Sequence, residues 1–210
     1  ICKFINKFYR ILLGVPSYTS TVGVHVELGR FPIDTNVHSA MLKYWTRLIT
    51  LPKSKLVSHC YWSLHNNPNS VAADPWLKSI KNVIFSTGQY QIWNNQCDLG
   101  EMGIKFAQKP LFYMCQNIKD QFIQQASSKM ESESKLVFFK NAKETLSVSN
   151  YLSKIKNRET RVLLSKLRLG VLPLEIEKGR RKGLVREERF CKFCNGNRIE
   201  DEVHFLFECP

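Results

Sequence analysis

The feature that most constrains the fold is a set of potential metal ligands within the last twenty residues. Three cysteines and one histidine follow the spacing Cys-x2-Cys-x9-His-x4-Cys, at Cys191, Cys194, His204 and Cys209. The short first gap allows a tight turn to direct two sulfurs at one ion, and the Asn195-Gly196-Asn197 run supplies a reversal because Asn and Gly tolerate positive φ. Four protein ligands fill the tetrahedral coordination of zinc, so the spacing predicts a structural zinc site with no open position for a substrate.

The second half of this motif constrains its own backbone. His204 and Cys209 are five residues apart, which is about 140° on a regular α-helix, so an unbroken helix cannot direct both at one ion. We therefore expect the helix to end or unwind near Glu208, so that Cys209 turns back. The acidic run Glu200-Asp201-Glu202 is expected to cap the helix that carries His204.

The other four cysteines are widely separated and show no metal-binding spacing. Cys2, Cys60, Cys97 and Cys115 are interpreted as buried thiols in a reducing compartment, which predicts an intracellular protein of the nucleus or cytoplasm. A thiol enzyme is the poorest functional hypothesis. His59 beside Cys60 is the remaining His–Cys pair, and adjacent residues on a helix or strand do not face each other.

Positive charge is concentrated just before the metal motif. The chain has a formal net charge of +13. Between Lys154 and Arg189 there are twelve Lys or Arg against five Glu, a net charge of +7. A stripe of guanidinium groups is expected to face outward from a helix over 158–169, and a flexible basic cluster is expected at 178–183. Such a patch favours RNA or DNA as the partner. We predict nucleic-acid contacts from Arg158, Arg161, Arg168, Lys178, Arg180, Arg181, Lys182 and Arg189.

Apolar residues at helical spacing predict a mainly α fold: an irregular helical region followed by a small Cys3His zinc module. Asp74-Pro75 predicts a helix start, and Pro110 predicts another. The polar run 130–135 predicts a loop and the best candidate boundary. We expect an extended segment at 172–177, and the apolar stripes are expected to form core. The expected regions are a helical region over 1–148, a basic helix and loop over 149–189, and the zinc module over 190–210.

Two further expectations concern the surroundings of the chain. No apolar run approaches the ~20 residues that a membrane-spanning helix needs, so no membrane partner is expected. The chain lacks an initiator Met and stops one residue after the last potential ligand. We therefore expect a piece of a longer polypeptide.

Several stretches together resemble a known family. The chain is similar to the C-terminal part of the polyprotein of LINE-type non-LTR retrotransposons, which follows the reverse transcriptase domain and ends in a zinc-binding domain. The resemblance implies a thumb- and linker-like helical region that grips template and primer, the upstream reverse transcriptase portion as a partner, and Cys191, Cys194, His204 and Cys209 as the ligands. The matching stretches are FYRILLGVPSYTS, VELGRFPI, MLKYWTRL, NIKDQFIQQ, LLSKLRLGVLPLEIEKGR, EERFCKFC and DEVHFLFECP.

Catalytic carboxylates are missing from the pattern. Polymerase chemistry needs carboxylates that hold two metal ions, and no Asp-Asp pair occurs in the sequence. We expect no enzymatic activity, no catalytic residue and no small-molecule substrate. The alternative is a zinc-stapled helical module that binds other proteins. It predicts weak, salt-insensitive contact with nucleic acid and an exposed apolar patch. Four phenylalanines in the motif (Phe190, Phe193, Phe205 and Phe207) could stack on bases, although two or three are expected to form a small core.

Overall fold

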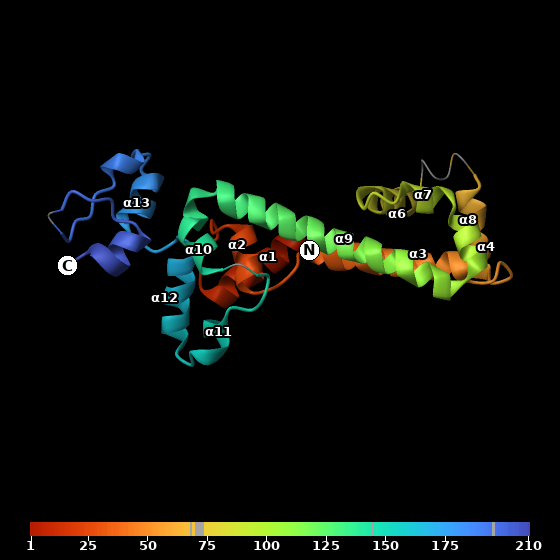
Figure 1. Cartoon of the computed structure of the whole chain (residues 1–210), viewed down its shortest axis with the longest axis horizontal. Helices are drawn as coiled ribbons and strands as arrows, with labels where there is room; N and C mark the ends of the chain where they lie inside the picture. The colour runs from red at the N-terminus through yellow and green to blue at the C-terminus, as the bar shows by residue number, and fades with distance from the viewer. Residues whose placement is uncertain (68, 70–73, 144, 195) are drawn as a thin grey trace. The chain divides into compact units, whose positions relative to one another are not determined.

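The fold is mainly α-helical, as the sequence predicts. The computed structural model describes residues 1–67, 69, 74–143, 145–194 and 196–210 (Figure 1). Within these residues no β-strand forms, and the extended pairings are two isolated antiparallel bridges, Leu28 with Val148 and Phe190 with Ile199. No helix of the described residues is long and apolar enough to cross a membrane.

Packing divides the chain into two units. One unit contains residues 1–31 and 124–210, and the other contains residues 32–123. The boundary falls inside the long helix α9 (Ile104–Ser132). This grouping places the N-terminal segment with the C-terminal basic and metal-binding regions. The three consecutive regions expected from the sequence are a different division, and they remain a prediction.

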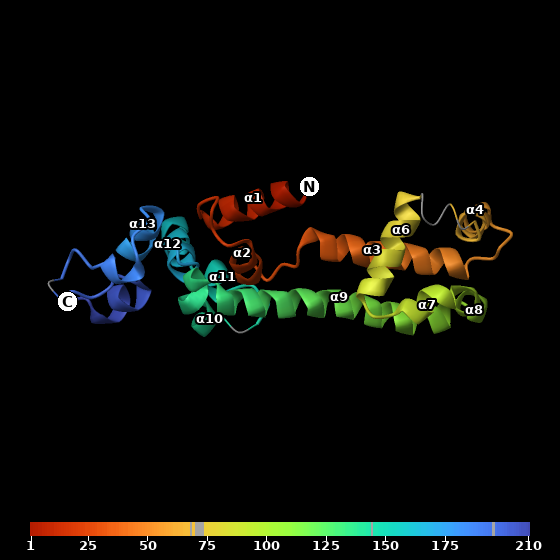
Figure 2. The same cartoon turned by 90° about the horizontal axis from the view of Figure 1, so that it is seen from above.

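The unit of residues 32–123 has a core of aromatic and aliphatic side chains. Leu42 and Trp45 are fully buried with Leu77, Ile80 and Met114, and α6 lies across α3 (Figure 2). The apolar stripe of α3, which includes Leu42 and Trp45, therefore forms core as expected. Besides its part of α9, the unit contains α3 (Ile33–Thr50), α4 (Leu56–His65), α6 (Pro75–Ser86), α7 (Tyr90–Asn94) and α8 (Gln96–Met102).

Two proline positions show which local signals decide a helix start. The Asp74 carboxylate accepts the Leu77 N–H at 2.8 Å and Pro75 is the first residue of α6, as predicted. The expectation for Pro110 is wrong, because Pro110 lies inside α9. The chain already leaves the preceding helix at Gly103, whose φ is +84°. Helix α9 then starts at Ile104. Pro110, in its second turn, has no N–H to donate, and the helix continues through it.

The expected loop at 130–135 is also wrong. Helix α9 continues through Ser132, and only Glu133 is extended before the short 3-10 helix η1 (Ser134–Leu136). Polar residues are compatible with a helix when they lie on a solvated face, and Met130, Glu131 and Ser132 have good or moderate helix propensity. The boundary of the packed units lies earlier, at 123–124.

The unit of residues 1–31 and 124–210 buries Leu13, Val24, Leu136, Phe139 and Leu169. Gly170 has φ +62°, and a Cβ at this position would stand 2.1 Å from the Lys135 carbonyl oxygen, so glycine is required there. The remaining helices of the unit are α1 (Cys2–Leu13), α2 (Thr21–Glu27), α10 (Val137–Ala142), α11 (Asn150–Lys154), α12 (Arg158–Arg168) and α13 (Glu175–Arg181), with the 3-10 helix η2 (Arg186–Glu188) and the π-helix η3 (His204–Glu208).

The apolar face of α1 is not core, contrary to expectation. Helix α1 ends at Leu13 with Gly14 in the left-handed region. However, Phe4 is 74% exposed, Phe8 is 53% exposed and Leu12 is 59% exposed. Helix α1 buries its opposite edge through Leu13, and its apolar stripe is left on the surface of the unit.

Candidate metal centre and its basic neighbour

The first two potential ligands lie on a turn held by a short antiparallel pairing. The Cys191 N–H donates to the Arg198 carbonyl at 2.8 Å, and the Glu200 N–H donates to the Arg189 carbonyl at 3.0 Å. Asn197 has φ +46°, so an asparagine makes the reversal that the sequence predicts. Asn195 lies outside the described residues. The Phe193 N–H points at the Cys191 sulfur at 3.4 Å, which is typical of a turn that wraps around a thiolate.

The second pair of ligands is brought together by a π-helix. Asp201 Oδ1 accepts the His204 N–H at 3.0 Å and caps the helix, as expected for the acidic run. The Cys209 N–H donates to the His204 carbonyl at 2.8 Å, five residues back. A π-turn is wider than an α-turn and places residue i+5 over residue i, so Cys209 lies over His204. The helix ends at Glu208 and Cys209 is extended, as predicted.

The four side chains converge on one point. One sulfur or nitrogen atom from each of Cys191, Cys194, His204 and Cys209 lies within 4.8 Å of the others. Cys191 Sγ is 3.9 Å from Cys209 Sγ, and Cys194 Sγ is 3.3 Å from His204 Nε2. Two sulfurs at about 2.3 Å from a tetrahedral zinc ion would be about 3.8 Å apart. The thiols are free rather than joined by disulfides. The cluster therefore can hold a metal ion.

The electrostatics of the cluster fit a cation at its centre. Burial alone raises the pKa of the Cys191 thiol, whereas donation from the Phe193 and Cys194 N–H groups and from His204 lowers it, and the result is a pKa of about 7. Burial and the neighbouring thiols of Cys191 and Cys194 raise the pKa of Cys209 to about 11. Three thiolates this close repel each other, and a divalent cation removes that repulsion.

The histidine is oriented for ligation through its outer nitrogen. His204 is 2% exposed, and its Nε2 faces the Cys194 sulfur. Its buried Nδ1 has no hydrogen bond among the described residues, and the nearest carboxylate oxygen, Glu208 Oε2, is 3.5 Å away. Ligating histidines usually direct the second nitrogen at a carboxylate or carbonyl. Glu208 is placed for that role and also pairs with Arg198 at 3.0 Å.

The metal cluster is attached to α13 rather than folded alone. The Glu200 side chain is 3% exposed and accepts the Glu175 N–H at 2.7 Å. The Glu200 carbonyl accepts the Ile176 N–H at 3.1 Å, and Arg186 pairs with Asp201 at 3.0 Å. Glu200, which lies between Cys194 and His204 in the sequence, thus caps the first turn of α13. The position of this helix therefore depends on the fold of the segment that carries the ligands.

The phenylalanines around the ligands are on the surface. Phe193 is 82% exposed, Phe207 is 75% exposed, and Phe190 and Phe205 are close to half exposed. The expected small aromatic core is therefore wrong. The ligands themselves occupy the interior of so short a segment, and the aromatic rings are displaced outward.

Two of the three arginines in the predicted outward-facing stripe on α12 have partners within the protein. Arg168 forms a bidentate pair with the buried Glu27 of α2, with Nε 2.7 Å from Oε1. Arg161 donates to the carbonyls of Ile155 and Lys156 at 2.7 and 3.0 Å. Leu163, on the same helix, is 57% exposed. The Glu27 carboxylate balances the charge of Arg168, and two backbone carbonyls accept hydrogen bonds from Arg161. Arg158, at the start of the helix, is exposed.

The basic cluster at 178–183, which was expected to be flexible, lies largely in a helix. The extended segment expected at 172–177 is wrong beyond Leu174, because the helix begins at Glu175. Residues 175–181 form α13, whose N-terminal turn is capped through Glu200. Glu177 is 1% exposed and accepts cations from three sides: Arg180 at 2.5 Å, Lys135 at 3.0 Å and Arg181 at 3.6 Å. We name these four residues the Glu177 cluster.

Three other predicted contacts differ in their availability. Arg189 crosses α13 at Gly179, where a Cβ would stand 2.6 Å from the Arg189 Cγ, and donates to the carbonyls of Leu184 and Ile176. It therefore has a structural role. Lys178 is half exposed and lies 3.5 Å from Glu175. Lys182, just beyond the helix, is exposed.

Sequence reasoning missed two partners of the basic helix. Lys135 joins the Glu177 cluster from η1, and Tyr18 lies beneath two of its cations, with the Arg181 guanidinium 4.4 Å and the Lys135 Nζ 5.1 Å from the ring centre. The spacing of Glu177 with Arg180 and Arg181 is a usable helix signal. The participation of Lys135 and Tyr18 depends on tertiary packing and leaves no local pattern.

Comparison with protein-family models, with curated proteins and with solved structures finds no match for this chain.

Proposed function

We propose that this chain is a zinc-containing nucleic-acid-binding segment, of the kind that follows the reverse transcriptase domain in LINE-type non-LTR retrotransposons. It carries no catalytic role in this proposal. It assists the binding of template RNA or target DNA by the upstream reverse transcriptase portion. The resemblance of the quoted sequence stretches and the Cys3His geometry support the family assignment.

Zinc is the metal that best fits the ligand set. Three thiolates and one imidazole are soft and borderline ligands, and a closed tetrahedral arrangement of four protein ligands is typical of structural zinc. The sulfur–sulfur distance of 3.9 Å agrees with that geometry. Cys191, Cys194, His204 and Cys209 would hold the ion, which supplies folding free energy to the cluster and to the first turn of α13.

The observation that carries the nucleic-acid proposal is the Glu177 cluster. Three cations converge on one buried carboxylate, so the cluster has a local net charge of +2. Three of its four residues lie on α13, whose first turn Glu200 caps, and Lys135 lies on η1. The exposed Lys182 and the half-exposed Lys178 add to this charge. The Arg181 side chain is 52% exposed and lies 3.6 Å from Glu177, so it can contact a phosphate while Arg180 and Lys135 stay paired with the buried carboxylate.

The metal-binding segment itself does not attract phosphate. Residues 190–210 contain two Lys or Arg and four Asp or Glu, a net charge of 2 − 4 = −2. Zinc with three thiolates adds −1. The phosphate contacts of the proposal are therefore assigned to α13, and the metal cluster is assigned the role of holding α13 in place.

A salt series tests the proposal. Binding of the whole chain to labelled RNA and duplex DNA is expected to weaken with salt, with a log–log slope of about −0.9 for each phosphate neutralised on duplex DNA. If each of the three cations of the Glu177 cluster neutralises one phosphate, this surface contributes a slope of about −2.7. Arg181→Gln is expected to reduce the magnitude of the slope by about 0.9. Glu177 keeps Arg180 and Lys135 as partners in this variant, so the fold is retained.

The matched control is Lys53→Gln, which removes the same charge from an exposed side chain in the other unit. It is expected to leave the slope unchanged. Equal slopes for the Arg181 variant, the Lys53 variant and the unmodified chain would contradict the assignment of phosphate contacts to α13. Weak and salt-insensitive binding by all three would reject the nucleic-acid proposal.

The second candidate function is a protein-interaction module. The exposed apolar stripe of α1 favours it, because Phe4, Phe8 and Leu12 are each more than half exposed on one helix face. A flat salt response in the series above, with nucleic acid bound weakly, is the result that this candidate predicts.

A further inference from the structure

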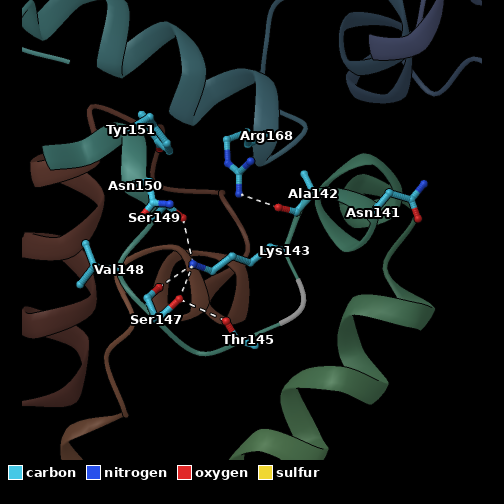
Figure 3. A pocket seen from close by; sticks show the side chains of 10 residues that line it. All are labelled: Asn141, Ala142, Lys143, Thr145, Ser147, Val148, Ser149, Asn150, Tyr151 and Arg168. Atoms are coloured by element: carbon cyan, nitrogen blue, oxygen red, sulfur yellow. Dashed lines mark hydrogen bonds between the residues drawn. The ribbon is translucent and has the colours of Figure 1, made fainter. Parts of the chain in front are cut away.

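A polar pocket of about 440 Å³ lies beside the connection from α10 to α11 (Figure 3). Its lining includes Thr145, Ser147, Ser149 and Asn150 from this connection and the start of α11, with Lys143 and Arg168 as the charged groups. Figure 3 shows the Lys143 side chain directed at Ser147 and Ser149, and Arg168 entering from α12. The pocket belongs entirely to the unit of residues 1–31 and 124–210.

The lysine of this pocket is buried and held in place. Lys143 is 9% exposed, and its Nζ donates to the Ser147 carbonyl at 2.6 Å and to the Ser149 hydroxyl at 3.1 Å. Burial lowers the pKa of Lys143 and nearby Arg168 lowers it further, while Glu27 raises it. The ammonium group of Lys143 is therefore held at a fixed place in the wall of the pocket.

The carboxylate that balances part of the charge of Lys143 and Arg168 is Glu27, which lies outside the lining of the pocket. Glu27 is fully buried and binds Arg168 through both oxygens and the Ser149 hydroxyl at 2.7 Å, but it does not line the pocket. Among the described residues the lining has two cations and no carboxylate. Glu144 lies outside those residues. The three charges Lys143, Arg168 and Glu27 leave a net charge of +1.

We propose that this pocket binds a phosphate group. The Thr145 and Ser147 hydroxyls and the Asn150 amide can donate to phosphate oxygens, whereas the Ser149 hydroxyl already donates to Glu27. The two cations supply the field that favours an anion over water. The volume is large enough for a nucleotide-sized ligand. The phosphate can come from free phosphate or from a nucleic-acid backbone, and in the latter case the inference rests on the proposed function.

Asn150→Asp tests the site without disturbing the buried network. Asn150 is exposed and is the first residue of α11, where an aspartate is favourable for the helix. The new carboxylate opposes phosphate in the pocket. The whole chain is titrated with inorganic phosphate at constant ionic strength, and binding is followed by calorimetry and by the amide resonances of Ser147, Ser149 and Asn150. We expect saturable shifts at these amides and an affinity at least about tenfold lower in the variant.

The control is Asn157→Asp, which adds the same charge at the N-cap of α12, outside the pocket lining. It is expected to bind phosphate as the unmodified chain does. Equal weakening in both variants, or no saturable shift at the three amides, would overturn the proposal. A parallel titration with a short single-stranded oligonucleotide separates the two sources, because only a backbone site makes oligonucleotide affinity fall with Asn150→Asp. Phosphate binding without any nucleic-acid binding leaves the pocket intact and rejects the proposed function instead.

Discussion

Replacing Cys191 by serine is expected to abolish stoichiometric metal binding and to unfold the segment from Phe190 to Cys209. A hydroxyl is a poor substitute for a thiolate ligand, and three remaining ligands leave the ion open to water. Loss of a residue that only hydrogen-bonds to a ligand costs about 10- to 100-fold in metal affinity, so we expect the loss of a ligand itself to cost more than about 100-fold. Metal content after dialysis measures the first effect.

Hydrogen exchange measures the second effect. The Cys191 and Glu200 amides donate across the Phe190–Ile199 bridge, and the Ile176 amide of α13 donates to Glu200. All three are expected to lose protection in Cys191→Ser. The control is Cys60→Ser, outside the cluster. Cys60 is an exposed free cysteine, as is Cys97, so the expectation that these thiols are buried is wrong. One metal ion retained by Cys191→Ser with unchanged affinity, or equal metal loss in both variants, would contradict the assignment.

The Cys3His cluster that could hold a metal ion can be predicted from sequence because its information is local. Ligand spacing, a reversal at Asn197 and the acidic cap at Asp201 all lie within twenty residues. Even the difficulty of the five-residue gap between His204 and Cys209 predicted correctly that the helix ends at Glu208. The π-turn that solves the gap was not predicted, because helix periodicity in sequence is calibrated on 3.6 residues per turn.

The basic region was less accessible because its structure depends on distant partners. Helix periodicity placed Arg158, Arg161 and Arg168 on one face, but the partner of Arg168 is Glu27, 141 residues earlier in the chain. A charge pattern cannot distinguish a solvated face from one that meets a buried carboxylate. Similarly, α13 forms where Glu200 caps its first turn, 25 residues after the residue that it caps. Helix α6 could be predicted because its Asp74 cap and Pro75 are local, whereas the start predicted at Pro110 is wrong for α9.

Arg168→Met is expected to lower the free energy of unfolding of its unit by about 3–5 kcal/mol, the range for removing one partner of a buried ion pair. Glu27 is fully buried, and the Arg168 side chain is 17% exposed. The substitution leaves the carboxylate with the Ser149 hydroxyl and without its bidentate partner. Methionine preserves most of the aliphatic volume, so the loss reports the charge pair rather than a cavity. Denaturant unfolding of the whole chain gives the value.

Arg158→Met is the matched control for this prediction. Arg158 belongs to the same predicted stripe on the same helix, but it is exposed. Its substitution is expected to change the free energy of unfolding by less than about 0.5 kcal/mol, as for other surface positions. Nucleic-acid binding at a temperature where both variants are folded then separates the two roles. A stable Arg168→Met protein with weakened binding would show that Arg168 faces phosphate as the sequence pattern suggests, and that the Glu27 pair does not form in solution.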